Sequence, residues 1–235
     1  MIAKSQNQAL LTVAEKASLN PLWSSYSEYC KLREKGLRKQ SFEKLNIFIE
    51  SFKSFTFEQK TEFAIFIYEL AESVADADYG PLPHQLSIEI KEVLIAWTEN
   101  ESSDSRPFRW FAKFFHGFDY INKALDINPQ DDKARVFLIN SLTYEIWYST
   151  HHLPDYYIGE PDEDLQKANI AKQHIDKLTD YKQQYSCNQE LENALELVKS
   201  YSDWENSGGS PEFQNWAKQN QRKYDSGIVA YYYDE

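Results

Sequence analysis

The densest group of residues able to do chemistry lies between positions 145 and 164. It holds two adjacent histidines, His151 and His152, with Glu145 and Asp155 nearby in the sequence. Imidazole and carboxylate groups are ligands of zinc and non-haem iron, so a small metal-dependent enzyme is one hypothesis. However, adjacent side chains on a helix point about 100° apart, and zinc needs three or four converging ligands. The spacing therefore argues against a metal site and against catalytic residues in this region. We expect instead that a helix ends at the two histidines, where imidazolium complements the helix dipole.

The same region is rich in acids and tyrosines. No Lys or Arg occurs from Val136 to Gln166, whereas six acids do. Tyrosines commonly anchor protein interfaces, and an acidic surface steers a basic partner toward it. The alternative is that the acids at 162–164 only stabilise the first turn of a helix. The predicted protein-binding residues are Glu145, Tyr148, Asp155, Tyr156, Tyr157, Glu160, Asp162, Glu163 and Asp164.

Charge is unevenly distributed over the rest of the chain. The formal net charge is −12, and residues 61–105 contain one basic residue, Lys91, against ten acids. Residues 31–44 are the reverse, with six basic residues against two acids. These stretches are either ordinary solvated helix faces or parts of a polarised surface. Because nucleic-acid binding depends on a basic face, the overall charge predicts a protein partner, basic in character, and no nucleic acid.

Recognisable catalytic and cofactor motifs are absent. The sequence contains no nucleophile elbow, P-loop or dinucleotide fingerprint, and its 7 glycines leave little material for cradling phosphates. Cys30 and Cys187 form no CxxC pair, so we interpret them as buried small hydrophobes in a reducing, cytoplasmic compartment. No cofactor is expected.

Length and composition indicate one globular chain. With 235 residues and 42% apolar residues, the sequence can bury a sizeable core as a single domain spanning 1–235, with a short flexible tail at 223–235. No apolar run approaches the roughly 18 residues that span a bilayer, and the first 20 residues do not resemble a secretion signal, so no membrane partner is expected.

Apolar residues recur at helical spacing along the whole chain. Helical hairpins are predicted at about 21–35/40–54, 57–77/84–99, 107–126/131–150 and 163–181/189–205, with a short helix at 211–222. The segments 63–74 and 134–147 are apolar nearly all round, so we expect both to be covered from two sides. Residues 228–233 are the one run that suggests a strand, and we favour a loose end there. The predicted helix boundaries are a capping box at Thr56/Gln59, a cap at Asn188, a cap and first-turn proline at Ser210-Pro211-Glu212, and breaks at Gly80-Pro81 and Ser207-Gly208-Gly209.

One segment resembles a known repeat family. The run from Ala124 to Pro129, with Gly117 seven residues before the alanine and Leu138 opening the next unit, is similar to the end of a tetratricopeptide repeat. The strict 34-residue period of that family is not kept, and His151 falls where a small residue is expected. The resemblance implies an all-α chain of stacked antiparallel hairpins, a right-handed α-solenoid of about 8–10 helices that binds peptides or proteins.

These observations predict a non-enzymatic protein-binding chain. In general character it resembles the bacterial immunity proteins that neutralise basic nuclease toxins, which implies a basic toxin as partner. The alternatives are an adaptor that holds a peptide in a solenoid groove and, behind it, the metal-dependent enzyme at His151 and His152.

Overall fold

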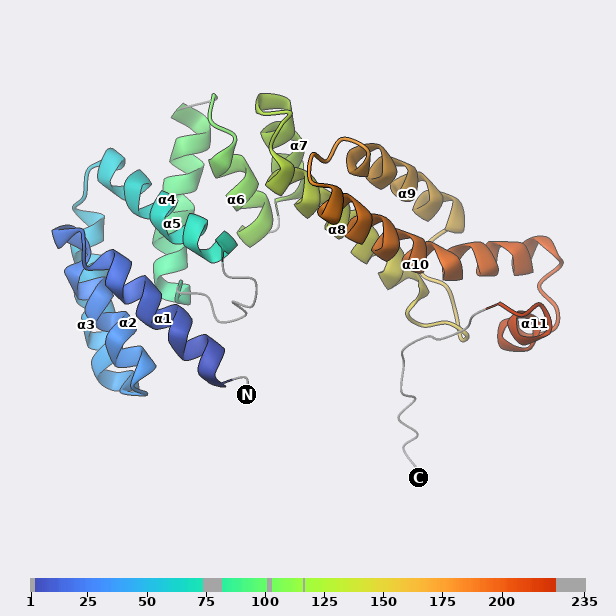
Figure 1. Ribbon diagram of the computed structural model, residues 1–235, viewed down its shortest axis with the longest axis horizontal. Helices are drawn as coiled ribbons and strands as arrows, with labels where there is room; N and C mark the ends of the chain where they lie inside the picture. Colours follow the sequence, from blue (N-terminus) through green and yellow to red (C-terminus); the bar gives the residue numbers. More distant parts are fainter. Residues whose placement is uncertain (1–2, 74–81, 101–102, 116, 223–235) are drawn as a thin grey trace. The chain divides into compact units, whose positions relative to one another are not determined.

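The computed structural model describes residues 3–73, 82–100, 103–115 and 117–222, with side chains from Leu10 onward. Every regular element in these residues is helical (Figure 1): there are eleven α-helices and one 3₁₀ helix, and no strand. The prediction of an all-α chain is therefore confirmed. The predicted tail at 223–235, the run at 228–233 and the break at Gly80-Pro81 lie outside the described residues.

The chain divides into two compact units, Met1–Ile127 and Asn128–Glu235, which we call unit 1 and unit 2. The prediction of a single domain over 1–235 stays a prediction. Unit 1 contains α1 (Ala3–Ala17), η1 (Pro21–Trp23), α2 (Ser24–Glu34), α3 (Arg38–Lys53), α4 (Phe57–Ser73), α5 (His84–Asn100), α6 (Arg106–Phe115) and α7 (Phe118–Ile127). Unit 2 contains α8 (Asp132–Thr150), α9 (Pro161–Ile175), α10 (Tyr181–Asn206) and α11 (Phe213–Gln219).

Unit 1 is built around buried aromatic rings. Its helices pack against their sequence neighbours, α1 on α2, α2 on α3, and α4 to α7 in succession. Phe63 of α4 is fully buried. Its ring centroid lies 4.8 to 6.0 Å from five other rings, within the range of favourable aromatic pairs. Those five rings belong to Trp23, Tyr26, Phe48, Phe52 and Phe66.

A buried ion pair joins α4 to α6 within unit 1. Arg109 Nε donates to Glu72 Oε1 at 2.9 Å, and Trp110 Nε1 donates to the same oxygen at 3.0 Å. The side chains of Glu72 and Arg109 are only 2% and 7% exposed. Because a buried charge must be paired and hydrogen-bonded, this acid of the 61–105 stretch has a structural role.

Unit 2 centres on three helices. Each of α8, α9 and α10 packs against the other two, and α11 packs on the end of α10. Ala168 and Ala171 of α9 are buried, as are larger side chains of the two helices that α9 packs against. The larger buried side chains include Leu138, Ile139 and Ile146 of α8 and Leu191 and Val198 of α10.

Several predicted helix ends are confirmed. Thr56 and Gln59 form a reciprocal capping box, in which each side chain accepts a hydrogen bond from the other residue's backbone N–H, at 3.2 and 3.0 Å. At the C-terminal end of α10, Gly208 has φ of 101° and Gly209 N–H donates to the Trp204 carbonyl at 3.0 Å. This Schellman geometry satisfies carbonyls left free by the helix end, as expected for the glycine pair.

The predicted single helix at 107–126 is wrong. The structure breaks it into α6 and α7 at Gly117, where an added Cβ would lie 2.8 Å from the Phe111 ring and 3.0 Å from the Tyr120 ring. The helical spacing of Phe114, Phe118, Ile121 and Leu125 therefore does not place them on one face, and Phe118 is 43% exposed. The apolar spacing continued across the break, which concealed it.

Three helix boundaries in unit 2 also differ from prediction. The helix α9 ends at Ile175 and α10 begins at Tyr181, eight residues before the predicted start. Asp180 caps α10 by accepting from the N–H groups of Lys182 and Gln183, whereas Asn188 lies inside the helix. The helix α11 begins at Phe213 with Glu212 as N-cap and no side-chain cap bond, so Pro211 precedes it.

Both cysteines are buried free thiols, as interpreted from the sequence. Burial raises the pKa of Cys30 to about 12. Burial, followed by the nearby Glu190 carboxylate, also raises the pKa of Cys187.

In the part of the chain that the structure describes, none of the helices has the length and apolar character needed to cross a bilayer.

Candidate protein-interaction surface

A continuous row of exposed rings runs along the second half of α8 and into the turn that follows it. Tyr144, Trp147, Tyr148 and Tyr156 are 61%, 46%, 46% and 52% exposed. The two histidines connect them: ring centroids are 4.4 Å apart for Tyr148 and His151, 3.9 Å for His151 and His152, and 4.6 Å for His152 and Tyr156. We call this set the aromatic ladder; its members are Tyr144, Trp147, Tyr148, His151, His152 and Tyr156.

The helical spacing of α8 explains the position of the ladder. Positions 144, 147, 148 and 151 follow the i, i+3, i+4, i+7 pattern of one helix face. The opposite face, including Leu142 and Ile146, is buried in unit 2. The expectation that 134–147 is covered from both sides is therefore wrong for its second half, where Tyr144 and Trp147 are exposed.

The turn after α8 separates two adjacent tyrosines. The helix ends at Thr150 with His151 as C-cap, as predicted for the histidine pair. Leu153 is 1% exposed and packs with Phe213 and Ala217 in a small satellite core. This anchor leaves Tyr156 outside, stacked on His152, and turns Tyr157 inward.

Tyr157 belongs to a polar network within unit 2. Its hydroxyl donates to Asp164 Oδ2 at 2.6 Å, and its ring stacks on Tyr201 with centroids 4.8 Å apart. Lys167 Nζ donates to Asp164 Oδ1 at 2.9 Å and lies 3.5 Å from Glu145 Oε2. One lysine thus neutralises two of the six acids, and the network ties α9 to α8 and to the turn.

Burial and charge shift the titration of this network. Burial, then the hydrogen bond to the Asp164 carboxylate, raises the pKa of Tyr157 well above its usual range. Burial alone would lower the pKa of Lys167, but the carboxylates of Asp164 and Glu145 outweigh it and raise the pKa overall. The phenol therefore stays protonated and the ammonium charged at neutral pH, which preserves the network.

The structure divides the predicted binding residues into two groups. Asp164, 1% exposed, is withdrawn from the surface, and Tyr157 is half-buried, so neither fits the expected docking role. Glu145 is half-buried beside Lys167. Asp162, Glu163 and Asp164 lie in the first turn of α9, where they complement its dipole as the alternative interpretation expected. The exposed members are Tyr148, Asp155, Tyr156, Glu160, Asp162 and Glu163.

The arrangement offers no convergent metal ligands. Among the described residues, no group of three or more His, Cys, Asp or Glu side chains could hold an ion. His151 Nδ1 lies 2.5 Å from the carbonyl oxygen of Tyr148, and its ring is in contact with its neighbours in the ladder. Glu145, the expected partner carboxylate, pairs instead with Lys167.

The other acidic stretch, 61–105, is partly neutralised from neighbouring helices. Besides the Glu72–Arg109 pair, Asp104 Oδ2 accepts from Arg106 at 2.7 Å and Glu69 lies 3.6 Å from Arg106. Burial alone would raise the pKa of Asp104, but its hydrogen bonds and charge interaction with Arg106 lower it overall. These three acids, Glu69, Glu72 and Asp104, therefore help to hold α6 within unit 1.

Four members of the ladder, Tyr144, Trp147, His151 and His152, are not among the predicted protein-binding residues. Tyr144 and Trp147 lie in the segment 134–147, for which the sequence predicts cover from both sides, and the two histidines are interpreted as a helix end. The signal was present, because four large aromatic or imidazole side chains at i, i+3, i+4 and i+7 lie opposite a complete aliphatic stripe.

Comparison of the chain with protein-family models, with curated proteins and with solved structures gave no match.

Proposed function

We propose that this chain is a non-enzymatic binding protein that docks a basic protein partner on the aromatic ladder. The observation that carries the proposal is the exposure of a connected row of large rings, with exposed acids close to it in the sequence. Isolated exposed apolar residues are ordinary, whereas a contiguous exposed patch is typical of interaction sites. Tyrosine and tryptophan are also the residues that most often dominate binding energy at interfaces.

The charge around the ladder favours a basic partner. Asp155, Glu160, Asp162 and Glu163 are exposed, whereas Lys167, the next basic residue along the chain, is engaged by Asp164 and Glu145. An Arg or Lys from the partner would gain a cation–π contact with a ring and a carboxylate nearby. Ring-to-ring contacts already restrict the side chains, so less conformational entropy is lost on binding.

A toxin-neutralising immunity protein of the cytoplasm is the specific form of this function that we propose. Its support is by analogy of physical character: small size, net charge of −12 and an acidic aromatic surface suited to a basic nuclease. The adaptor hypothesis is the second form. It rests on the helical-repeat arrangement that the tetratricopeptide resemblance implies, supported by neighbour-to-neighbour helix packing.

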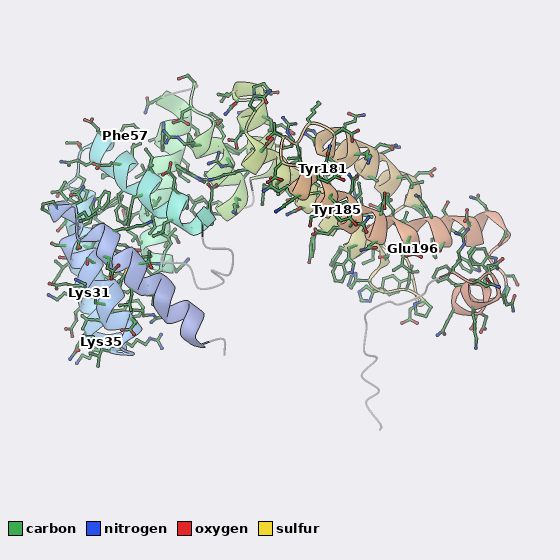
Figure 2. All side chains as sticks on the ribbon, in the orientation of Figure 1. Lys31, Lys35, Phe57, Tyr181, Tyr185 and Glu196 are labelled. Carbon is green, nitrogen blue, oxygen red and sulfur yellow. The ribbon has the colours of Figure 1, made fainter. Side chains whose placement is uncertain are left out.

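The test is affinity capture from the native cell with three immobilised proteins: the natural chain, a Tyr144→Ser/Trp147→Ser/Tyr148→Ser variant, and a Tyr181→Ser/Tyr185→Ser control. The control removes two tyrosines of α10 that are 75% and 59% exposed and are not members of the ladder, so it tests whether the loss of surface tyrosines alone weakens capture. Figure 2 shows both control tyrosines at the beginning of α10.

We expect the natural chain and the control to retain a basic protein that elutes with rising salt, and the ladder variant to lose it. The reversal of Asp155, Glu160, Asp162 and Glu163 to lysine should weaken the same complex. The proposal would be refuted if every variant captured the identified partner equally well. It would also be refuted if no captured protein were lost from the ladder variant.

A further inference from the structure

The end of the hairpin formed by α2 and α3 concentrates positive charge in an acidic chain. Lys44, at its margin, pairs with Glu28 at 2.6 Å. In the described part of the chain, the other five cations of residues 31–44 have no carboxylate within 4.0 Å. We call these five the basic tip; they are Lys31, Arg33, Lys35, Arg38 and Lys39.

A glycine turn holds the tip in place. Gly36 has φ of 74°, and Leu37 N–H donates to the Leu32 carbonyl at 3.0 Å, which closes α2 with a Schellman motif. Figure 2 shows Lys31 and Lys35 along the last turns of α2, where the chain turns into α3. Lys31, Lys35, Arg38 and Lys39 are all exposed around this turn.

Two arginines of the tip are positioned by one ring. The guanidinium carbons of Arg33 and Arg38 lie 5.7 and 5.8 Å from the centroid of the Phe42 ring. Arg33 comes from α2, whereas Arg38 and Phe42 come from α3. Cation–π contacts of this kind restrict long side chains and keep their charge at the surface.

Helix stability explains only part of this charge. Lys31 and Arg33 lie in the last turn of α2, where cations complement the helix dipole. Arg38 and Lys39 begin α3, where the dipole disfavours cations, and that helix has no acid in its first turn and no side-chain cap bond. The positive charge at the start of α3 therefore opposes local stability and requires another explanation.

An apolar side chain lies at the centre of the tip. Leu37 is 43% exposed in the turn itself, between Lys35 and Arg38. The one aromatic residue of this hairpin end, Phe42, is half-buried and occupied by the two arginines, so it is not presented for stacking on nucleic-acid bases. An exposed leucine surrounded by lysine and arginine suits a deformable surface with an anionic exterior and an apolar interior.

We propose that the basic tip docks unit 1 on an anionic lipid surface, with Leu37 entering the headgroup layer. The expectation of no membrane partner rested on the lack of a spanning segment, which does not bear on peripheral docking. Attraction by the tip is local, because surface charges are screened beyond about 8 Å at physiological ionic strength. The net negative charge of the rest of the chain therefore does not prevent contact through the hairpin end.

The experiment measures co-sedimentation of the full chain with vesicles at physiological ionic strength, where surface charges are screened beyond about 8 Å. One set of vesicles is phosphatidylcholine with about one third phosphatidylserine, and the other is phosphatidylcholine alone. The test variant is Lys31→Gln/Lys35→Gln/Lys39→Gln. The matched control is Lys177→Gln/Lys182→Gln/Lys199→Gln, which changes the net charge equally at three exposed lysines of unit 2.

We expect the natural chain to bind only the anionic vesicles. Since each cation near such a surface is worth about a five-fold change in partition, the tip variant should bind about 100-fold more weakly. The control should stay within roughly three-fold of the natural chain, because screening limits the influence of distant charges. Leu37→Ser should weaken binding by roughly three- to ten-fold, since it removes apolar contact without changing charge.

Four outcomes would overturn the proposal: no binding to anionic vesicles, equal losses in the tip variant and the control, an unchanged partition for Leu37→Ser, or tighter binding to a single-stranded oligonucleotide than to the vesicles at the same salt. The last outcome would assign the tip to nucleic acid instead. Circular dichroism of each variant verifies that the helices are retained.

Discussion

The two units differ in where their aromatic rings lie: unit 1 has a large buried aromatic cluster, whereas unit 2 has a small one around Phe213 and a second row of rings at the surface. In unit 1 the rings of Trp23, Tyr26, Phe48 and Phe63 are buried and pack against one another. In unit 2 a comparable run of ring contacts, the aromatic ladder, lies at the surface. Charge differs as well: residues 1–127 contain 15 basic and 18 acidic residues, a net of −3, whereas 128–235 contain 10 and 19, a net of −9.

The contrast shows that ring-to-ring contact alone does not identify a core. In unit 1 the aromatic pairs accompany burial, which supplies most of their stabilising free energy. In unit 2 the aliphatic face of α8 and the small residues of α9 are buried, a small aromatic cluster packs around Phe213, and the rings on the other face of α8 are exposed. Substitutions of the same chemical kind should therefore affect stability in one unit and recognition in the other.

The largest effect is expected in unit 1. Phe63→Ala removes a fully buried ring in contact with five others, so the free energy of unfolding should fall by about 3–5 kcal/mol, as measured by urea denaturation. Phe57→Ala, at the exposed start of the same helix, is the matched control and should cost much less. Equal losses for the two variants would contradict the assignment of the aromatic core.

A smaller effect should separate the neighbouring tyrosines of unit 2. Tyr157→Phe removes the hydroxyl that donates to buried Asp164 at 2.6 Å, so unfolding should become easier by about 1–2 kcal/mol. Tyr156→Phe alters an exposed residue and should leave stability unchanged. The pair would contradict the structure if Tyr156→Phe were the more damaging substitution in thermal or urea denaturation.

Much of the fold, but less of the surface, could be predicted from the sequence. The spacing of apolar residues predicted α4, α5 and α8, and the Thr56/Gln59 pair predicted the capping box. Both signals are encoded within a few neighbouring residues. The break at Gly117 was missed, since the apolar pattern continues across it and only the nearby rings of Phe111 and Tyr120 reveal the close approach. The burial of Asp164 was missed for a related reason: Tyr157 and Lys167 satisfy its charge through contacts formed in the folded chain.

The cysteines offer a comparison of thiol reactivity between the units. Burial raises the pKa of Cys30 to about 12, and it also raises that of Cys187. A raised pKa keeps the reactive thiolate scarce, and fully buried Cys30 is also inaccessible, so native Cys187 should be alkylated faster at pH 8 to 9. Because the unfolded thiol ionises near pH 8.5, stability should decrease as pH rises from there toward 12. Mass spectrometry of the peptides measures the rate of alkylation at each cysteine. Faster labelling of Cys30 than of Cys187 would argue against the compact core of unit 1.

The smallest change in stability is expected at the ladder itself. Trp147 is 46% exposed, and its ring contacts are with other surface residues, Tyr144 and His151. Trp147→Ala should therefore lower the free energy of unfolding by about 1 kcal/mol or less, since little buried area and no core cavity are involved. The same substitution at fully buried Trp110 of unit 1 is the control and should cost about 3–5 kcal/mol. If Trp147→Ala lowered the free energy of unfolding as much as the Trp110 substitution does, the ladder would be needed for folding. The exposed rings would then give no support to a role in recognition.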